Sequence, residues 1–167
     1  LAGCLRAISL LQNKIPVSVH SIQQGIKDAR IEGRLQVLSK KPYVLADVAH
    51  NADAANNLYK FFKATKQRGK IYAVFSILEN KDIQQVLLPF IDIVDEWFVS
   101  EINDPGTQKI EVILSSLKVC AKNVIINKYN SVSQAYKNAY KKCNLNDNII
   151  VYGSFFTVSE SMHGVKI

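Results

Sequence analysis

The sequence predicts an α/β fold: a Rossmann-like three-layer domain with a mostly parallel sheet of five or six strands, preceded by two helices. Apolar runs such as 43–46 and 149–152 contain no polar residue, which is typical of short strands buried on both faces. Segments whose apolar residues recur at helical spacing follow these runs, so strands and helices alternate along the chain. Such alternation favours parallel pairing with helices packed on the sheet.

The two helices at the start of the chain stand outside this alternation. Residues 1–12 carry apolar side chains at helical spacing, and Pro16 ends that pattern. Ser18 then opens a second helix, for which we expect Ile22 and Ile26 on the buried side. No strand separates the two helices, in contrast to the βα alternation that follows.

The most informative stretch is 43–62, which predicts a strand, a short polar turn and a helix. The apolar run from Tyr43 to Ala46 meets Asp47, His50 and Asn51 within five residues. Asn51 suits the N-cap position of the helix that follows. Apolar residues at helical spacing should face the core from that helix; they are Ala54, Ala55, Leu58, Phe61 and Phe62.

This geometry has a chemical consequence for Asp47 and His50. Side chains at the carboxyl end of a parallel strand face the crevice where α/β proteins bind ligands. The free N–H groups at the start of a helix favour anions at the same place. A turn-capping Asp47 and an ordinary surface His50 are the alternative, and would be preferred for either residue alone. Because both occur on one strand-to-helix turn, the functional interpretation is favoured.

The remaining elements alternate in the same way, after a turn at Gly33 and Arg34 that leads into a strand. Asp104-Pro105-Gly106 lies in a polar loop and indicates a turn. In order, the expected elements are strand 35–38, strand 70–77, a helix from 80 to about 90, strand 96–100, a helix capped by Thr107, strand 124–126, a helix from Ser131, strand 149–152 and a helix ending at Met162.

The composition excludes several classes of protein. Hydrophobic residues make up 48% of the 167 residues, which argues against disorder and allows one domain with a substantial core. No apolar run approaches the roughly 20 residues that span a bilayer, and no signal peptide is visible. Cys4, Cys120 and Cys143 form no Cys-x-x-Cys pair, so we expect reduced cysteines in the cytoplasm. Because the chain begins with Leu1, we expect a fragment or a processed product.

Charge and glycine motifs narrow the function further. The formal net charge is +7, but the lysines are scattered without an aromatic-basic motif, so we expect no nucleic-acid partner. Neither Gly-x-Gly-x-x-Gly nor Gly-x-x-x-x-Gly-Lys-Ser/Thr occurs. The chain is therefore predicted to be neither a free-standing NAD enzyme nor a free-standing ATPase.

Several motifs resemble one known family. Asp-Val-Ala-His-Asn at 47–51 resembles the Asp-Gly/Val-Ala-His-Asn motif of folylpolyglutamate synthases and dihydrofolate synthases, in the Mur ligase superfamily. Val48 is similar to the bifunctional bacterial members, and 33–36 resembles that family's Gly-Arg-Phe-Glu/Gln. Gly-Ser at 153–154, after a strand, also matches. The resemblance covers nearly the whole chain, as the carboxyl-terminal part of a longer enzyme.

The resemblance implies a domain organisation and an activity. Residues 1–32 would be the C-terminal helices and linker of a central ATP-binding domain, and 33–167 a Mur-ligase-type C-terminal domain. The enzyme would be a cytoplasmic monomer that adds L-glutamate to dihydropteroate or tetrahydrofolate through an acyl phosphate. ATP and Mg²⁺ would be held mainly by the N-terminal domain, with no metal ligand and no membrane partner in this chain.

The same resemblance assigns four residues. Arg34 would contact ATP phosphates and Asp47 the nucleotide, while His50 would position L-glutamate and Ser154 would bind its carboxylate. Ser154 is also a natural helix N-cap, which alone would explain a serine there. Two alternatives stay open: a related Mur-type ligase for another acidic amino acid, and a non-catalytic Rossmann-like module that binds an anion or nucleotide.

Overall fold

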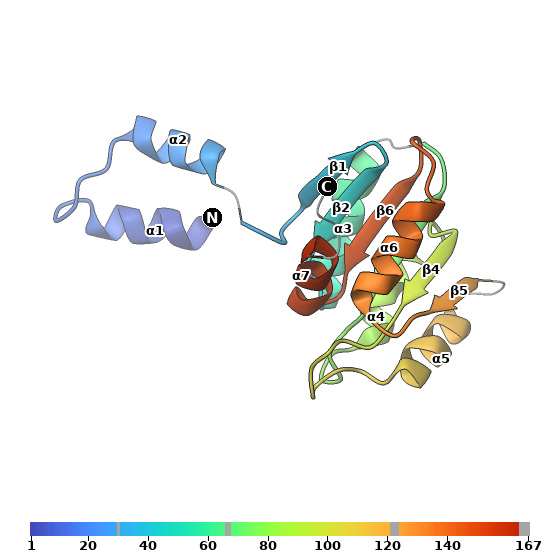
Figure 1. Ribbon diagram of the computed structural model, residues 1–167. Coiled ribbons are helices and arrows are strands. Elements are labelled where there is room, and N and C mark those ends of the chain that lie inside the picture. The colour runs from blue at the N-terminus through green and yellow to red at the C-terminus, as the bar shows by residue number, and fades with distance from the viewer. Residues whose placement is uncertain (30, 66–67, 121–123, 164–167) are drawn as a thin grey trace. The chain divides into compact units, whose positions relative to one another are not determined.

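The computed structural model describes residues 1–29, 31–65, 68–120 and 124–163, and the chain divides into two compact units, Leu1–Ile31 and Glu32–Ile167 (Figure 1). The first unit holds helices α1 (Ala2–Leu11) and α2 (Val19–Asp28). Ser18 caps α2 by accepting the Ser21 N–H at 3.0 Å. No residue of α1 or α2 is buried, so the expectation that Ile22 and Ile26 face a core is not met within this unit.

The second unit is built on a mixed, mostly parallel sheet, as the sequence predicts. Within the described residues the sheet has six strands in the order β1-β2-β6-β3-β4-β5. Only β1 runs antiparallel to its neighbour β2; the other neighbours pair in parallel. The strands are β1 (Gln36–Lys40), β2 (Tyr43–Asp47), β3 (Ile71–Phe75), β4 (Glu96–Val99), β5 (Ile125–Lys128) and β6 (Asn148–Tyr152).

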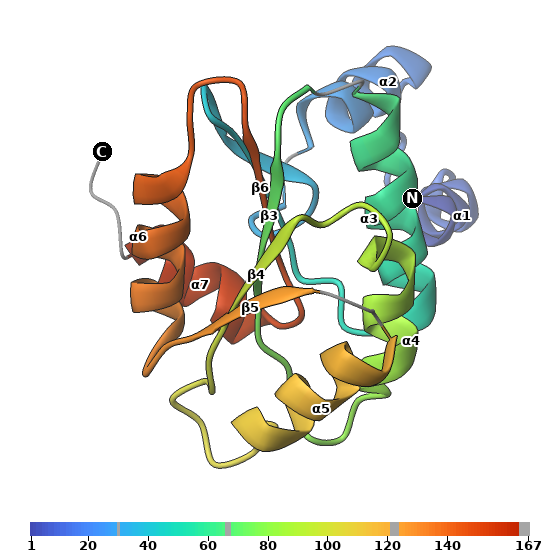
Figure 2. The same ribbon diagram turned by 90° about the vertical axis from the view of Figure 1, so that its right-hand side faces the viewer.

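Helices cover both faces of this sheet and give it three layers (Figure 2). One face carries α3 (Ala52–Ala64), α4 (Ile83–Leu87), the short 3₁₀ helix η1 (Leu88–Phe90) and α5 (Ile110–Cys120). The opposite face carries α6 (Val132–Lys142) and α7 (Phe155–His163). The three-layer α/β architecture predicted from the alternation is therefore confirmed.

Alternate residues of each central strand serve the two cores. In β2, Leu45 packs toward α3 and α4, whereas Val44 and Ala46 pack toward α6 and α7. This is why the run at 43–46 contains no polar residue: both faces of the strand are buried. The first core also contains an aromatic group, in which the ring of Tyr152 lies 4.9 Å from Phe75 and 4.5 Å from Phe90, measured between centroids.

Two local expectations are wrong. Phe61 is 38% exposed, because α3 turns Leu58 and Phe62 to the core and leaves Phe61 at the edge of that face. Thr107 does not cap the next helix: α5 begins only at Ile110. The Thr107 hydroxyl instead accepts the N–H of Ile102 at 2.8 Å, so it holds the loop after β4.

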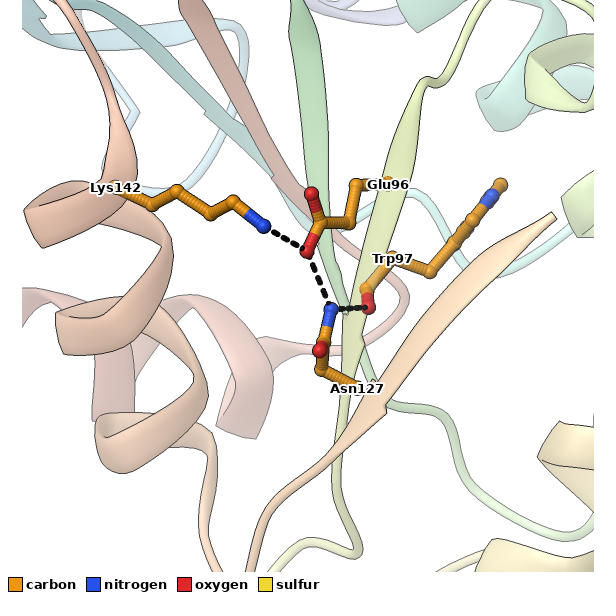
Figure 3. A network of polar contacts seen from close by, with 4 residues as sticks. All are labelled: Glu96, Trp97, Asn127 and Lys142. Atoms are coloured by element: carbon orange, nitrogen blue, oxygen red, sulfur yellow. Dashed lines mark hydrogen bonds and ion pairs between the residues drawn. The ribbon is translucent and has the colours of Figure 1, made fainter.

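Polar side chains anchor the amino end of the sheet. The carboxylate of Glu96, at the start of β4, lies 2.7 Å from Lys142 Nζ on α6 and 2.7 Å from Asn127 Nδ2 on β5 (Figure 3). The Asn127 amide also donates to the backbone oxygen of Trp97 at 3.3 Å. Glu96 is only 4% exposed, so its charge is buried with partners rather than alone.

The strand order creates a switch point at β6. Strands β2 and β3 lead into α3 and α4 on one face, while β6, which lies between them, leads into α7 on the other face. The chain segments leaving β6 and its two neighbours therefore diverge to opposite sides of the sheet. In open α/β sheets such a divergence leaves a crevice at the carboxyl ends of the strands.

Candidate functional site

A hollow of about 190 Å³ lies at this switch point. Residues that follow three different strands line it: His50 after β2, Lys81 after β3, and Ser154 after β6. The full lining, which we call the switch-point hollow, is His50, Leu78, Lys81, Gly153, Ser154, Phe155 and Phe156. The fold thus brings together His50 and Ser154, two predicted site residues that are far apart in the sequence.

The backbone fixes the tautomer of His50. Its Nδ1 lies 2.8 Å from the backbone oxygen of Val48, which can only accept a hydrogen bond. Nδ1 therefore carries a hydrogen, and Nε2 is the ring nitrogen available to a ligand. The next residue, Asn51, caps α3 by accepting the Ala54 N–H at 2.9 Å, as the sequence predicts, so the histidine stands at a helix N-terminus.

Lys81 also lines the hollow, although the sequence pattern around it indicates only the start of a helix. It precedes Asp82, whose carboxylate caps α4 by accepting the Gln85 N–H at 3.2 Å. That capping explains the aspartate but leaves the neighbouring lysine unexplained, and the structure places Lys81 on the switch-point hollow. Its position after β3 corresponds to that of His50 after β2, and this correspondence is the signal that could have found it.

The position of Ser154 is fixed by a hydrogen bond from Thr157 on one side and by the tight packing of Gly153 on the other. Its Oγ accepts the Thr157 N–H at 2.9 Å, as a helix N-cap residue does, and the residue is 3% exposed. Gly153 has a φ of +118°, and a Cβ there would lie 2.1 Å from the backbone oxygen of Ser76. Only glycine fits at 153, so the Gly-Ser pair sets where the serine sits.

Asp47 and Arg34 lie near the hollow but do not line it. Asp47 is 5% exposed, and its Oδ2 accepts the N–H of Leu35 at 2.8 Å. Burial raises the pKa of the Asp47 carboxyl, although the Leu35 N–H and the Arg34 guanidinium act to lower it. The Arg34 guanidinium carbon lies 5.6 Å above the centroid of the Phe155 ring, a cation–π arrangement.

The segment that carries Arg34 is tied to the turn after β2. Val48 donates its N–H to the Gly33 oxygen at 2.8 Å, next to the bond between Asp47 and Leu35. Leu35 has a φ of +43°, a left-handed conformation that costs a non-glycine residue about 1 kcal/mol. The hydrogen bond that the Leu35 N–H donates to Asp47 offsets that cost, so this carboxylate helps to place Arg34.

Residues 33–155 match the family described as Mur ligase, glutamate ligase domain. This range contains the candidate site residues at 34, 47, 50, 81 and 154 and most of the elements that position them. The chain belongs to the Mur ligase glutamate ligase domain family.

Individual relatives of this Mur ligase domain carry more specific names. The dihydrofolate synthase/folylpolyglutamate synthase of Escherichia coli strain K12 is 33% identical over 154 residues, which are 92% of this chain and 35% of that protein. A structure of E. coli FolC in complex with DHPP and ADP has a TM-score of 0.82 at 33% identity, over 92% of this chain and 36% of that one. The resemblance drawn from the sequence motifs is therefore confirmed.

Another solved Mur-type relative has a metal ion, a nucleotide analogue and an amino acid bound. The structure of a bifunctional folylpolyglutamate synthase/dihydrofolate synthase with Mn, AMPPNP and L-glutamate has a TM-score of 0.81 at 30% identity, over 95% of this chain and 37% of that one. The present chain thus spans little more than a third of the length of these relatives.

Two further observations concern metal sites and membrane-spanning helices in this chain. Across the residues that the structure describes, no group of three or more His, Cys, Asp and Glu side chains could hold a metal ion. Over the same residues, none of the helices combines the length and the apolar character needed to cross a membrane.

Proposed function

We propose that this chain is the C-terminal part of an ATP-dependent ligase that adds L-glutamate to dihydropteroate or tetrahydrofolate. The observation that carries the proposal is the convergence of His50, Lys81 and Ser154 on one hollow at the switch point. At about 190 Å³ the hollow is smaller than the roughly 300–1,000 Å³ typical of drug-sized ligands, so it suits a ligand the size of an amino acid. The relative with bound L-glutamate supports the same assignment.

The chemistry divides between this chain and the rest of the enzyme. ATP supplies the phosphoryl group that converts the carboxylate of the folate substrate into an acyl phosphate. The glutamate nitrogen then bonds to the carbonyl carbon, the bond to phosphate breaks, phosphate leaves with the electron pair, and the nitrogen gives up a proton. This chain would hold the amino acid in position and exclude water from the acyl phosphate.

Each predicted residue has a place in that division of labour. Arg34, which the Asp47–Leu35 hydrogen bond helps to place, would contact ATP phosphates through its planar donor groups. Asp47 would contact the nucleotide. His50 and Ser154 would bind the amino acid, with Lys81 as an additional positive charge for a carboxylate.

ATP and Mg²⁺ would be held mainly by the part of the enzyme outside this chain. Two observations support this: the sequence contains no Gly-x-x-x-x-Gly-Lys-Ser/Thr loop, and the longer relatives have room for such a domain. Residues 1–32 would belong to that central ATP-binding domain, and 33–167 to the glutamate ligase domain. The exposed apolar side chains of the first unit, such as Leu10 at 67% and Ile15 at 63%, favour this division.

We also propose a cytoplasmic, monomeric enzyme. Cys4, Cys120 and Cys143 are all free, which is the usual state of cysteines in a reducing compartment.

The test is glutamate-dependent ADP release by the full-length enzyme. Asp47→Ala should slow turnover about 100-fold or more, because Arg34 and the nucleotide lose a positioning contact. The matched control is Asp92→Ala, which removes an exposed carboxylate after η1 and should leave turnover unchanged. Circular dichroism should show both variants folded. Wild-type kinetics in Asp47→Ala would exclude the role of Asp47, and no glutamate-dependent ADP release by the wild type would exclude the function.

A further inference from the structure

Three buried oxygen atoms form a chain beneath the switch-point hollow. The Ser154 and Thr157 hydroxyl oxygens are 2.7 Å apart, and the Thr157 hydroxyl donates to the Ser76 backbone oxygen at 2.8 Å. Thr157 and Ser76 are fully buried, and Ser154 is 3% exposed. Ser154 alone of these three residues lines the hollow.

Counting hydrogens gives this chain a direction. The Thr157 hydroxyl has one hydrogen, and the Ser76 carbonyl can only accept. If Thr157 gave its hydrogen to Ser154, two oxygens without a hydrogen between them would face each other 2.8 Å apart in a buried place. Thr157 therefore donates to Ser76, and Ser154 must donate to Thr157.

This direction determines what Ser154 presents to a ligand. Its only hydrogen goes to Thr157, and one of its two lone pairs accepts the Thr157 N–H at 2.9 Å. One lone pair remains, so a ligand in the hollow meets an acceptor at this serine. An acceptor attracts an amine or ammonium N–H and repels a carboxylate oxygen.

Helix capping alone does not explain this arrangement. Capping of α7 requires only the bond from the Thr157 N–H to Ser154 Oγ. The second bond between the same two residues, through their hydroxyls, adds nothing to the cap. Its effect is that Ser154 donates its hydroxyl hydrogen to Thr157, because Thr157 already donates its own to the Ser76 backbone oxygen.

We propose that Thr157 is a positioning residue that turns the Ser154 hydroxyl so that Ser154 binds the amine of the incoming amino acid. The inference rests on the proposed glutamate ligase function and replaces the expectation that Ser154 binds the carboxylate. Lys81, the cation on the same hollow, is left to pair with a carboxylate of the amino acid. An amine that donates an N–H to Ser154 has its lone pair directed away from the serine, so this contact orients the amine for attack on a carbonyl carbon on its other side.

The first test compares two substitutions of Thr157 in the full-length enzyme. Thr157→Val keeps the shape but removes the hydroxyl, and should raise the KM for L-glutamate roughly tenfold, the effect of losing an oriented hydrogen bond to a charged group. The KM for ATP should not change. Thr157→Ser keeps the hydroxyl and should restore the wild-type KM. If Thr157→Val also has the wild-type KM for L-glutamate, the inference is wrong.

The second test uses a ligand without the amine and does not depend on Thr157→Val folding. Glutarate has both carboxylates of L-glutamate but no amino group, and it serves as a competitive inhibitor. Ser154→Ala should raise the KM for L-glutamate and leave the Ki of glutarate unchanged. A parallel rise in the Ki of glutarate would show that Ser154 contacts a carboxylate, which would overturn the inference. Glutamate-dependent ADP release by the wild type is measured first, since its absence would instead reject the proposed function.

Discussion

Two buried aspartates, one at each end of the parallel sheet, show opposite behaviour. Asp147 precedes β6 and accepts hydrogen bonds from the Lys70 N–H at 2.9 Å, the Asn144 N–H at 2.8 Å and the Asn144 side-chain amide at 3.2 Å. Asp47 is the last residue of β2 and accepts the Leu35 N–H at 2.8 Å. Both are 5% exposed. Burial acts to raise both pKa values, but the hydrogen bonds prevail at Asp147 and lower its pKa, whereas burial prevails at Asp47 and raises its pKa.

The difference separates polar groups that build the fold from polar groups that are available to a ligand. At the amino end, Asp147 and Glu96 are surrounded by donors from neighbouring elements. At the carboxyl end, His50 keeps one ring nitrogen available and Lys81 has no ion pair among the described residues. Burial alone therefore does not mark a functional residue; unused hydrogen-bonding capacity beside a hollow does.

Among the substitutions that compare the two ends of the sheet, the largest effect is expected from His50→Gln in the full-length enzyme. Glutamine retains some hydrogen-bonding capacity but not the imidazole geometry, so kcat/KM for L-glutamate should fall about 100-fold. The melting temperature should change little, because among the described residues His50 makes one side-chain hydrogen bond, to the Val48 oxygen, and the glutamine amide also carries N–H donors. Steady-state kinetics and thermal unfolding measure the two quantities. His20→Gln, at an exposed position of α2, is the control. Unchanged kinetics in His50→Gln would remove the functional distinction between the two ends.

Asp147→Asn should produce the opposite pattern, a loss of stability with unchanged kinetics. An amide cannot accept the Lys70 and Asn144 N–H groups on both of its terminal atoms, so we expect a loss of about 1–3 kcal/mol in the free energy of unfolding. Because the folded-state pKa of Asp147 is lowered, its contribution is present above the unfolded pKa of about 4 and is lost as the pH falls through the folded pKa.

Urea unfolding at several pH values measures this difference between the wild type and Asp147→Asn. The gap should be full at pH 7 and shrink as the pH falls below about 4. Asp92→Asn, an exposed carboxylate, should show no gap at any pH. A gap for Asp147→Asn that does not depend on pH would show that its ionised carboxylate is not what stabilises the fold.

The sequence predicted those parts of the fold that depend on local signals. Apolar runs identified the buried strands, and the side chains of Ser18, Asn51 and Ser131 cap the helices that were expected to begin at these residues. The capping prediction for Thr107 was wrong because its hydroxyl accepts the N–H of Ile102 in the preceding loop. The preference of threonine for helix caps gives no information about such a contact. The position of β6 between β2 and β3 is a matter of long-range pairing, which no local pattern contains.

The candidate site divides in the same way. Asp47 and His50 could be singled out because they follow a recognisable strand, whereas Ser154 and Arg34 needed the family resemblance. Lys81 was missed because its neighbour Asp82 already explains the helix start. The hollow itself depends on three loops that the strand order brings together, so its lining could not be derived from any one segment.

Asp47→Asn should gain stability relative to the wild type as the pH rises. The folded-state pKa of Asp47 is raised, so protonation favours the folded state, and the wild type loses that advantage as the pH rises from the unfolded pKa through the folded pKa. The asparagine does not titrate and its oxygen can still accept the Leu35 N–H. We expect a change smaller than the loss in Asp147→Asn, measured by urea unfolding between pH 3 and pH 7. If the stability of Asp47→Asn relative to the wild type fell over this range, the inference that the ionised Asp47 carboxylate destabilises the fold would be wrong.

The smallest effect is expected at the ion pair between Glu96 and Lys142. The Lys142 side chain is 52% exposed, so solvent screens the pair. In the Glu96→Gln variant, the amide oxygen of the glutamine can still accept a hydrogen bond from Asn127. We expect a loss of about 0.5 kcal/mol in unfolding free energy that shrinks in high salt. Glu111→Gln is the control, because its 3.6 Å pair with Lys128 is exposed on both sides. Kinetic constants should match the wild type; a changed KM for L-glutamate in Glu96→Gln would mean that the amino end also serves the ligand, and the division between the two ends would fail.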